Sequence, residues 1–176
     1  MRLALAFALL CAAVAALPAP AAADTVVRSD ERIGSFRVKS DGTLGGARNA
    51  FGVPSRSVRT SDVTCSVTWA RLGLRIGFYN LGGQPPCGRA TGHFSNAAIT
   101  GKQWRTGIGL RVGDLVTRLR SLYPGARYGA DGFGGWGWWL VPRRNATGSG
   151  TYPGLLARSR AGQVTALVVR YPAGGD

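Results

Sequence analysis

The side chains that most often act in catalysis are scarce in this sequence. His93 is the single histidine, and Ser95 follows it two positions later. A serine hydrolase needs a base beside its nucleophile, and the sequence has no Gly-x-Ser-x-Gly segment to present one. A lone histidine near a loop is more often a surface residue than a catalyst. We therefore expect no catalytic residue, and a hydrolase that uses His93 is the least favoured alternative.

Carboxylates and nucleotide-binding motifs give no stronger signal. Glu31 is the single glutamate. Asp41, Asp114 and Asp131 lie in turn-like segments, where aspartate usually bonds its own backbone. The glycines of GIGLRVGD, residues 107–114, are not followed by the Lys-Ser/Thr pair of a phosphate-binding loop. We predict no metal site and no cofactor.

The densest group of ligand-binding side chains lies in the segment GFGGWGWWL, residues 132–140. In a strand, Trp136 and Trp138 share one face with Leu140, and Trp139 shares the other face with Gly137 and Val141. Tryptophan is usually buried because its surface is large. Either all three rings are covered, or at least one lies on an open sheet face. The sequence leaves both interpretations open.

An open face would place arginine and tyrosine beside an exposed tryptophan. These residue types dominate the binding energy of protein–protein interfaces. Glycines in the same strand would let a partner approach the backbone closely. The predicted binding residues are Trp136, Trp138, Trp139, Arg75, Tyr79, Arg158, Arg160 and Arg170.

The first residues have the composition of a secretory signal peptide. Arg2 precedes an apolar run over residues 3–17, and small residues lead to Ala23. The run is too short to span a bilayer, and no later run is longer. We predict a signal peptide over residues 1–23, cleavage near Ala23, and a mature protein that is secreted or held in the cell envelope without a transmembrane segment.

Two cysteines, Cys65 and Cys87, remain after the predicted cleavage. An even pair in an oxidising compartment indicates a disulfide. It would close a loop of about twenty residues and stabilise the fold by roughly 3 kcal/mol. A zinc site would need a second cysteine pair or more histidines.

The chain is strongly basic, with 22 Lys and Arg residues against 8 Asp and Glu, a net charge of +14. Such a charge attracts anionic partners, among them cell-wall phosphates, acidic glycans and acidic proteins. A chain rich in arginine, alanine and glycine is also typical of a GC-rich bacterial genome. The basic residues are scattered and form no runs, so the sequence leaves the use of this charge open.

We therefore expect a secreted, non-catalytic binding module with a protein partner. The alternative is a cell-envelope or carbohydrate-binding protein whose tryptophan rings stack on sugars while arginines contact acidic groups. Coplanar rings along a groove would favour the carbohydrate, and a broad patch with scattered arginines would favour the protein. Single-stranded nucleic acid also binds aromatic and basic side chains, but an exported protein seldom meets it.

Two segments that resemble each other are the elements expected to position these residues. Residues 40–55 and 111–126 both begin at an aspartate–glycine turn, carry apolar residues at helical spacing and stop at glycine or proline. Asp41 or Thr43 would cap the first helix, and Asp114 the second. Short extended segments precede both helices, at residues 34–40 and 107–113.

Alternating apolar residues predict the strands that follow each helix. These strands fall within residues 65–80, 93–100, 135–142, 154–160 and 163–172. Ala161–Gly162 predicts a hairpin turn between the last two. Each half would then hold one helix and about three antiparallel strands.

The predicted fold class is α+β, with two tandem units that each pack a short helix on one face of a small antiparallel sheet. Residues 24–104 would form the first unit, which holds the disulfide, and residues 105–176 the second, which holds the tryptophan-rich strand. A single helix covers one face of a sheet, so the other face is left to solvent or to a partner.

This arrangement resembles the SmpA/OmlA-type repeat, and the tandem secreted beta-lactamase inhibitory proteins of actinobacteria. The resemblance rests on Gly42-Thr43-Leu44 with Phe51-Gly52-Val53-Pro54, and on Gly113-Asp114 with Tyr123-Pro124. The chain departs from those inhibitors because only its first half holds a cysteine pair, and because Asp114 stands where Ser or Thr is preferred. The resemblance implies a fold class and a tendency toward protein binding, and no inhibitory loop carries over.

Overall fold

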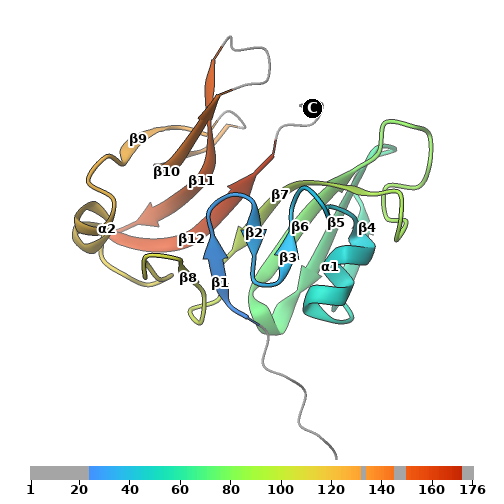
Figure 1. Ribbon diagram of the computed structural model, residues 1–176, viewed down its shortest axis with the longest axis horizontal. Helices are drawn as coiled ribbons and strands as arrows, with labels where there is room; N and C mark the ends of the chain where they lie inside the picture. Colours follow the sequence, from blue (N-terminus) through green and yellow to red (C-terminus); the bar gives the residue numbers. More distant parts are fainter. Residues whose placement is uncertain (1–23, 132–133, 145–149, 172–176) are drawn as a thin grey trace, which may run out of the picture.

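The computed structural model describes residues 24–131, 134–144 and 150–171. In this part of the chain the fold is α+β, with two α-helices and two sheets whose strands are mostly antiparallel (Figure 1). The predicted fold class is confirmed in this general form. The predicted signal peptide, residues 1–23, lies outside the described residues.

The elements alternate short helices with longer sets of strands. The first half contains β1 (Val26–Arg28), β2 (Arg32–Ile33), β3 (Phe36–Arg37), α1 (Leu44–Phe51), β4 (Arg56–Arg59), β5 (Thr64–Trp69), the 3-10 helix η1 (Ala70–Leu72), β6 (Leu74–Tyr79) and β7 (His93–Ile99). The second half contains β8 (Arg105–Thr106), α2 (Val116–Leu122), β9 (Arg127–Ala130), β10 (Trp136–Arg144), β11 (Thr151–Arg160) and β12 (Gln163–Arg170).

The larger sheet is antiparallel and has eight strands in the order β4-β5-β6-β7-β12-β11-β10-β9. Helix α1 precedes the first four strands along the chain, and α2 precedes the last four. The two sets meet where β7 pairs with β12, with Ile99 opposite Leu167 and Ala97 opposite Val169. Strands β4 and β9 were not predicted, because these four-residue strands show little apolar alternation.

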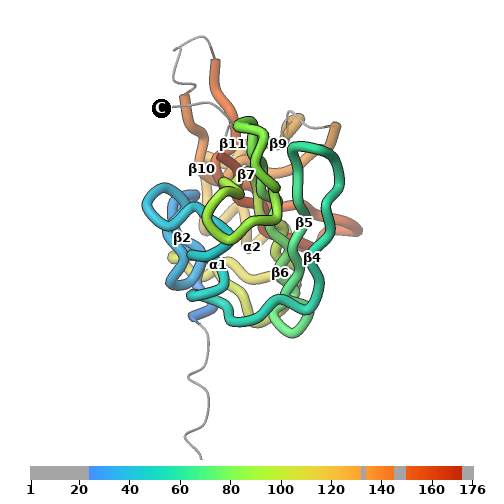
Figure 2. Tube along the Cα trace, turned by 90° about the vertical axis from the view of Figure 1, so that its right-hand side faces the viewer, coloured from blue at the N-terminus to red at the C-terminus, as the bar shows by residue number. Residues whose placement is uncertain are grey.

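A smaller sheet, in the order β3-β2-β1-β8, covers one face of the larger sheet together with the helices (Figure 2). The ring of Phe36 in β3 lies 5.9 Å from Phe94 in β7 and 6.0 Å from Phe51 in α1. A helix of eight residues is only about 12 Å long. The prediction that one helix covers each half was therefore incomplete, since the small sheet supplies much of the cover.

Helix α1 begins and ends as its sequence predicts. The Thr43 hydroxyl accepts a hydrogen bond from the Gly46 N–H at 3.1 Å, so Thr43 rather than Asp41 is the N-cap. Gly52 follows the helix with φ 79°, a conformation that favours glycine. Its carbonyl accepts a hydrogen bond from Trp69 Nε1 at 2.9 Å, which ties the end of the helix to β5.

Helix α2 begins differently from the prediction. The N-cap residue is Leu115, which makes no side-chain capping bond. The Asp114 carboxylate instead accepts from the Arg111 N–H at 2.8 Å and pairs with Arg118. Backbone hydrogen bonds from Val164 to Asp114 and from Gly113 to Val164 hold this segment against β12.

The last three strands form an antiparallel meander. Ala161 and Gly162 have φ of 50° and 77°, as a two-residue hairpin turn requires, so the predicted hairpin is confirmed. The pairing of β10 with β11 shifts between Trp139 and Val141. Val141 therefore pairs with Leu155 and packs against the core, although simple alternation placed it on the face of Trp139.

Cys65 in β5 and Cys87 in the loop before β7 form the predicted disulfide, which lies within the first half.

Besides the β7–β12 pairing, the two halves meet through Arg143 in β10, whose guanidinium donates to both carboxylate oxygens of Asp30 at 2.7 and 2.6 Å. This hydrogen bonding raises the pKa of Arg143 above its ordinary value. Among the described residues, no helix has the length and apolar character to cross a membrane.

The disulfide closes a span of 22 residues that would otherwise be free in the unfolded chain. We expect Cys65→Ala with Cys87→Ala to lower the free energy of unfolding by roughly 3 kcal/mol, because the unfolded chain gains loop entropy. Urea denaturation with and without reductant measures this. Reductant should lower the stability of the wild type and leave the variant unchanged. A loss below about 1 kcal/mol would contradict the expectation.

Candidate functional site

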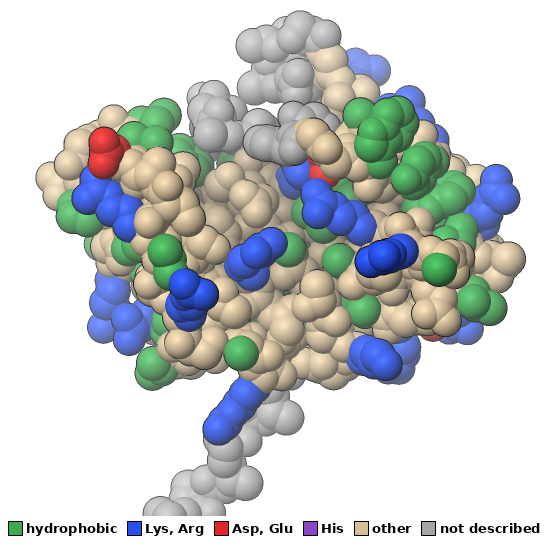
Figure 3. Space-filling model, turned by 180° about the vertical axis from the view of Figure 1, so that it is seen from behind, with side chains coloured by type: hydrophobic (Ala, Val, Ile, Leu, Met, Phe, Trp, Pro, Cys, Tyr) green, Lys and Arg blue, Asp and Glu red, His purple; other side chains and the backbone are tan. Residues whose placement is uncertain are grey.

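We call one face of the larger sheet the outer face. It points away from α1 and from the small sheet. No described helix or strand covers it (Figures 2 and 3). One row of directly paired residues crosses all eight strands on this face. From β4 to β9 this outer row consists of Arg56, Thr68, Arg75, Ala98, Val168, Leu156, Trp139 and Arg127.

The first half of the outer row is open and shallow. Arg75 is exposed between the buried residues Leu74 and Ile76, whose side chains point to the core. Its neighbours Thr68 and Ala98 are small and half-buried. A cavity of about 410 Å³ lies against these residues. A cation and small side chains therefore form a hollow that a protruding group could enter.

The second half of the outer row carries the aromatic residue. Trp139 is half-buried, and its Nε1 donates to the Ala130 carbonyl at 3.1 Å. The Arg127 guanidinium lies 4.5 Å from the centre of the Trp139 ring, a cation–π geometry. Arg127 was not among the predicted binding residues. The missing information was the pairing of β9 with β10, which sets Arg127 opposite Trp139.

Glycine in the tryptophan-rich strand leaves room for a neighbour from β11. A Cβ on Gly137 would lie 2.6 Å from Leu156 Cδ1, closer than real contacts allow. Leu156 is fully buried although it lies on the outer face. Packing of Leu156 therefore requires glycine at position 137, between the tryptophans of this strand.

A buried ion cluster closes the outer face beside Trp139. Asp131 is buried and binds Arg158 at 2.8 Å and Arg170 at 3.0 Å. It also accepts from the Gly135 N–H at 2.9 Å, which ties the residue just before β10 to the cluster. Burial lowers the pKa of Arg170, and the charge of Asp131 opposes that shift. Arg170 was expected on an exposed surface, but this charge pairing allows it to be 7% exposed.

The predicted binding residues are divided between two faces. Arg75, Trp139, Arg158 and Arg170 lie on the outer face, and Arg160 follows them by strand alternation. Trp136 and Trp138 lie on the opposite face, beyond the end of α2, where the Arg120 guanidinium is 5.4 Å from the Trp138 ring centre. No single surface therefore holds all of them.

The opposite face carries an exposed aromatic pair at its edge. Trp136 is 60% exposed and Tyr128 is 54% exposed. Their rings are nearly parallel, with an interplanar angle of 24° and centroids 5.9 Å apart. Trp138 is half-buried, and its Nε1 donates to the Ser159 hydroxyl at 3.2 Å. The tryptophan cluster is thus neither wholly core nor wholly surface.

Tyr79 and His93 lie together at the end of β6 and β7, with ring centroids 6.0 Å apart. Both border a cavity of about 280 Å³ that also involves Lys39 and Tyr171. His93 is exposed, and in residues 24–131, 134–144 and 150–171 it takes part in no ion pair. The same part of the chain has no cluster of His, Cys, Asp and Glu that could hold a metal ion.

Comparison with known proteins gives no match to a family model, to a curated protein or to a solved structure.

The Asp131 cluster is expected to be essential for stability. Asp131→Asn removes the charge that balances the buried Arg170, so we expect the free energy of unfolding to fall by about 3 kcal/mol. Asp62→Asn is the matched control, because its pair with Arg59 is exposed and should contribute nothing measurable. Urea denaturation of both variants measures the difference. Equal stability of the two variants would contradict the role of the cluster.

Proposed function

We propose that the mature chain is a secreted, non-catalytic binding module that docks a protein partner on its outer face. The outer row is the observation that carries this proposal. It aligns Arg75, Trp139 and Arg127 on one face, and no described helix or strand lies over them. Tryptophan and arginine are the residues that most often dominate binding energy at protein interfaces.

The size of the outer face supports a macromolecular partner. Eight strands spaced about 4.8 Å apart span about 34 Å, and a six-residue strand is about 20 Å long. The resulting upper limit, which includes the end closed by the Asp131 cluster, is roughly 700 Å², below the ~800 Å² that each partner contributes to a standard interface. Arg75 and Trp139 stand four strands apart, about 19 Å, which is a span for a protein surface rather than for one small molecule.

The charge of the outer face favours an acidic partner surface over a basic one. The outer row contains three arginines and no carboxylate. Asp131 also belongs to this region, but Arg158 and Arg170 bind it. Figure 3 shows Lys and Arg side chains spread over the face, with hydrophobic side chains gathered toward the end of β9 and β10. Such a field accelerates encounter with an oppositely charged partner.

We further propose that the two halves are tandem units of the kind found in SmpA/OmlA-type and beta-lactamase inhibitory proteins. Each helix precedes a four-stranded set, and the sets meet through their last strands, which gives the sheet a mirrored strand order. The Thr43 cap and the Gly52 turn support the motif in the first half. The second half matches the motif less well, because its helix α2 has Leu115 at the N-cap position and no side-chain capping bond.

Secretion is part of the same proposal. A disulfide between Cys65 and Cys87 is expected in an oxidising compartment, and it agrees with removal of residues 1–23 as a signal peptide. Export would bring the basic outer face to partners outside the cell.

The nearly parallel, exposed rings of Tyr128 and Trp136 favour a second function, binding of a cell-wall polysaccharide. Aromatic faces of this kind can stack on sugar rings, and Arg120 beside Trp138 could contact an acidic group. This surface lies on the opposite side of the sheet from Trp139. The two functions therefore depend on different tryptophans.

Trp139→Ala and Trp136→Ala separate the two functions, because each variant is the control for the other. We expect Trp139→Ala and Arg75→Ala to weaken capture of a protein partner from the native envelope and secretome by roughly 30-fold, equivalent to about 2 kcal/mol. Trp136→Ala should capture that protein as the wild type does. Circular dichroism confirms that each variant is folded before the comparison.

Equal capture by the Trp139 and Trp136 variants would exclude the outer face as the docking surface. If the wild type retains cell-wall polysaccharide and no protein, and Trp136→Ala loses that retention, the second function replaces the first.

A further inference from the structure

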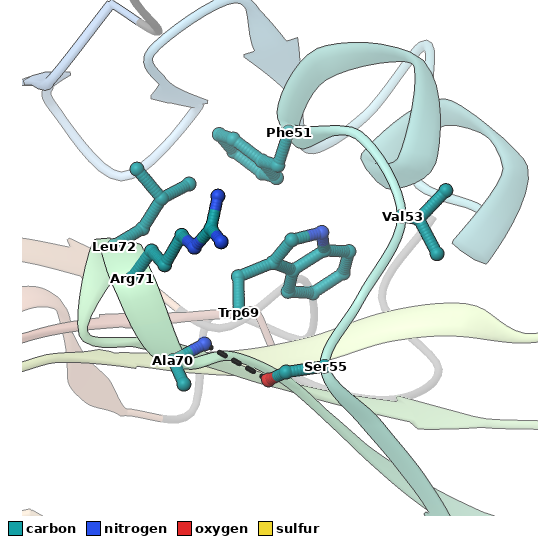
Figure 4. A pocket seen from close by; sticks show the side chains of 7 residues that line it. All are labelled: Phe51, Val53, Ser55, Trp69, Ala70, Arg71 and Leu72. Carbon is teal, nitrogen blue, oxygen red and sulfur yellow. Dashed lines mark hydrogen bonds between the residues drawn. The ribbon is translucent and has the colours of Figure 1, made fainter.

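A separate cavity lies between the end of α1 and η1, on the side of the sheet that the helix covers. It measures about 270 Å³, near the lower limit for small-molecule sites. Its lining is mostly apolar. The residues are Phe51, Val53, Ser55, Trp69, Ala70, Arg71 and Leu72 (Figure 4).

Two aromatic rings in contact with each other form one wall of this cavity. Trp69 is 3% exposed, and its ring meets Phe51 edge-on with centroids 5.6 Å apart. Val53 is 80% exposed and lies on the connection that borders the cavity. An apolar side chain so exposed at the border of an aromatic cavity adds to the apolar surface that a ligand could cover.

The side-chain polar groups of the cavity wall are occupied, with one exception. The Ser55 hydroxyl donates to the Thr68 carbonyl at 2.8 Å and accepts from the Ala70 N–H at 3.0 Å. Trp69 Nε1 is already bound to the Gly52 carbonyl. Within the described residues, no carboxylate pairs with Arg71. Among the side chains of the wall, the Arg71 guanidinium therefore remains to bond a ligand, and it can only donate hydrogen bonds.

The backbone of Arg71 is held in a tight turn, and its side chain is exposed at the mouth of the cavity. Its carbonyl accepts from Gln103 Nε2 at 3.3 Å, and Gly73 ends η1 with φ 56°. A Cβ on Gly73 would lie 2.5 Å from the Gly101 nitrogen, so this turn requires glycine. In Figure 4 the Arg71 guanidinium extends from the turn toward Phe51, between Leu72 and Trp69.

We propose that this cavity binds a small carboxylic acid with an aromatic or branched apolar body. The aromatic walls would bury the body, and Arg71 would donate charge-assisted hydrogen bonds to the carboxylate. A neutral polar ligand would leave the guanidinium without a charge partner, and a cation would be repelled. The cavity shares Ala70 with the hollow beside Arg75, but it uses a different arginine and different apolar side chains, so its failure leaves the proposed docking function untouched.

Calorimetric titration of the mature chain with 3-phenylpropionate and with 3-phenylpropanol tests the charge requirement directly. The two probes share the apolar body and differ in the carboxylate. We expect the acid to bind roughly ten- to a hundredfold more tightly, the range of one charged hydrogen bond. Titration followed by NMR should move the Trp69 indole N–H signal, which reports on this cavity alone.

Arg71→Gln should remove the preference for the acid, and Arg75→Gln, four positions away on the outer face, should preserve it. Val53→Asp is a second variant, at a residue too exposed to disturb folding. Its carboxylate should weaken binding of the acid, because the two negative charges repel each other. Absence of binding, equal binding of the two probes, or an unchanged preference in Arg71→Gln would overturn the proposal. Binding of the tripeptide Gly-Gly-Phe without binding of the free acid would also overturn it, since the occupant would then be a peptide end.

Discussion

The pairing of β7 with β12 is the contact on which the rest of the structure depends. It joins two four-stranded sets into one sheet and fixes their register, with Ile99 opposite Leu167 and Ala97 opposite Val169. These four side chains are buried in one core that contains residues of both halves. Because strand register assigns every side chain to a face, this one pairing also decides which residues of each half lie together on the outer face.

One-sided cover is the second constraint. The helices and the small sheet all pack on the inner face, which holds the buried aliphatic and aromatic residues. The outer face carries small polar residues and arginines in the first half. In the second half it carries Trp139 and the buried Asp131 cluster. The cluster replaces an apolar cover at that end, because a carboxylate between two arginines allows Arg170 to be buried.

The sequence predicted the helices and the hairpin because each has a local signal, and the disulfide because two cysteines follow the predicted cleavage site. A cap at Thr43, a stop at Gly52, and the Ala161–Gly162 turn are set by neighbouring residues. The candidate site was predicted only in part. Arg127 and Asp131 were not recognised as members, because their partners are brought to them by strand pairing and not by spacing in the chain. Strand alternation predicted that the tryptophans are divided between two faces. The exposure of Trp136 and Trp138 could not be predicted, because it depends on how much of their face α2 covers.

The central claim is that the outer face of the first four strands of the larger sheet, β4 to β7, is open to solvent. A soluble gadolinium chelate tests it, because the chelate broadens the NMR signals of methyl groups that solvent reaches. The account predicts strong broadening of the Ala98 and Thr68 methyl signals and little broadening for Ile76 and Ile99, which point into the core. If Ala98 were as protected as Ile76 in the mature chain, the face would be covered and the account would be contradicted.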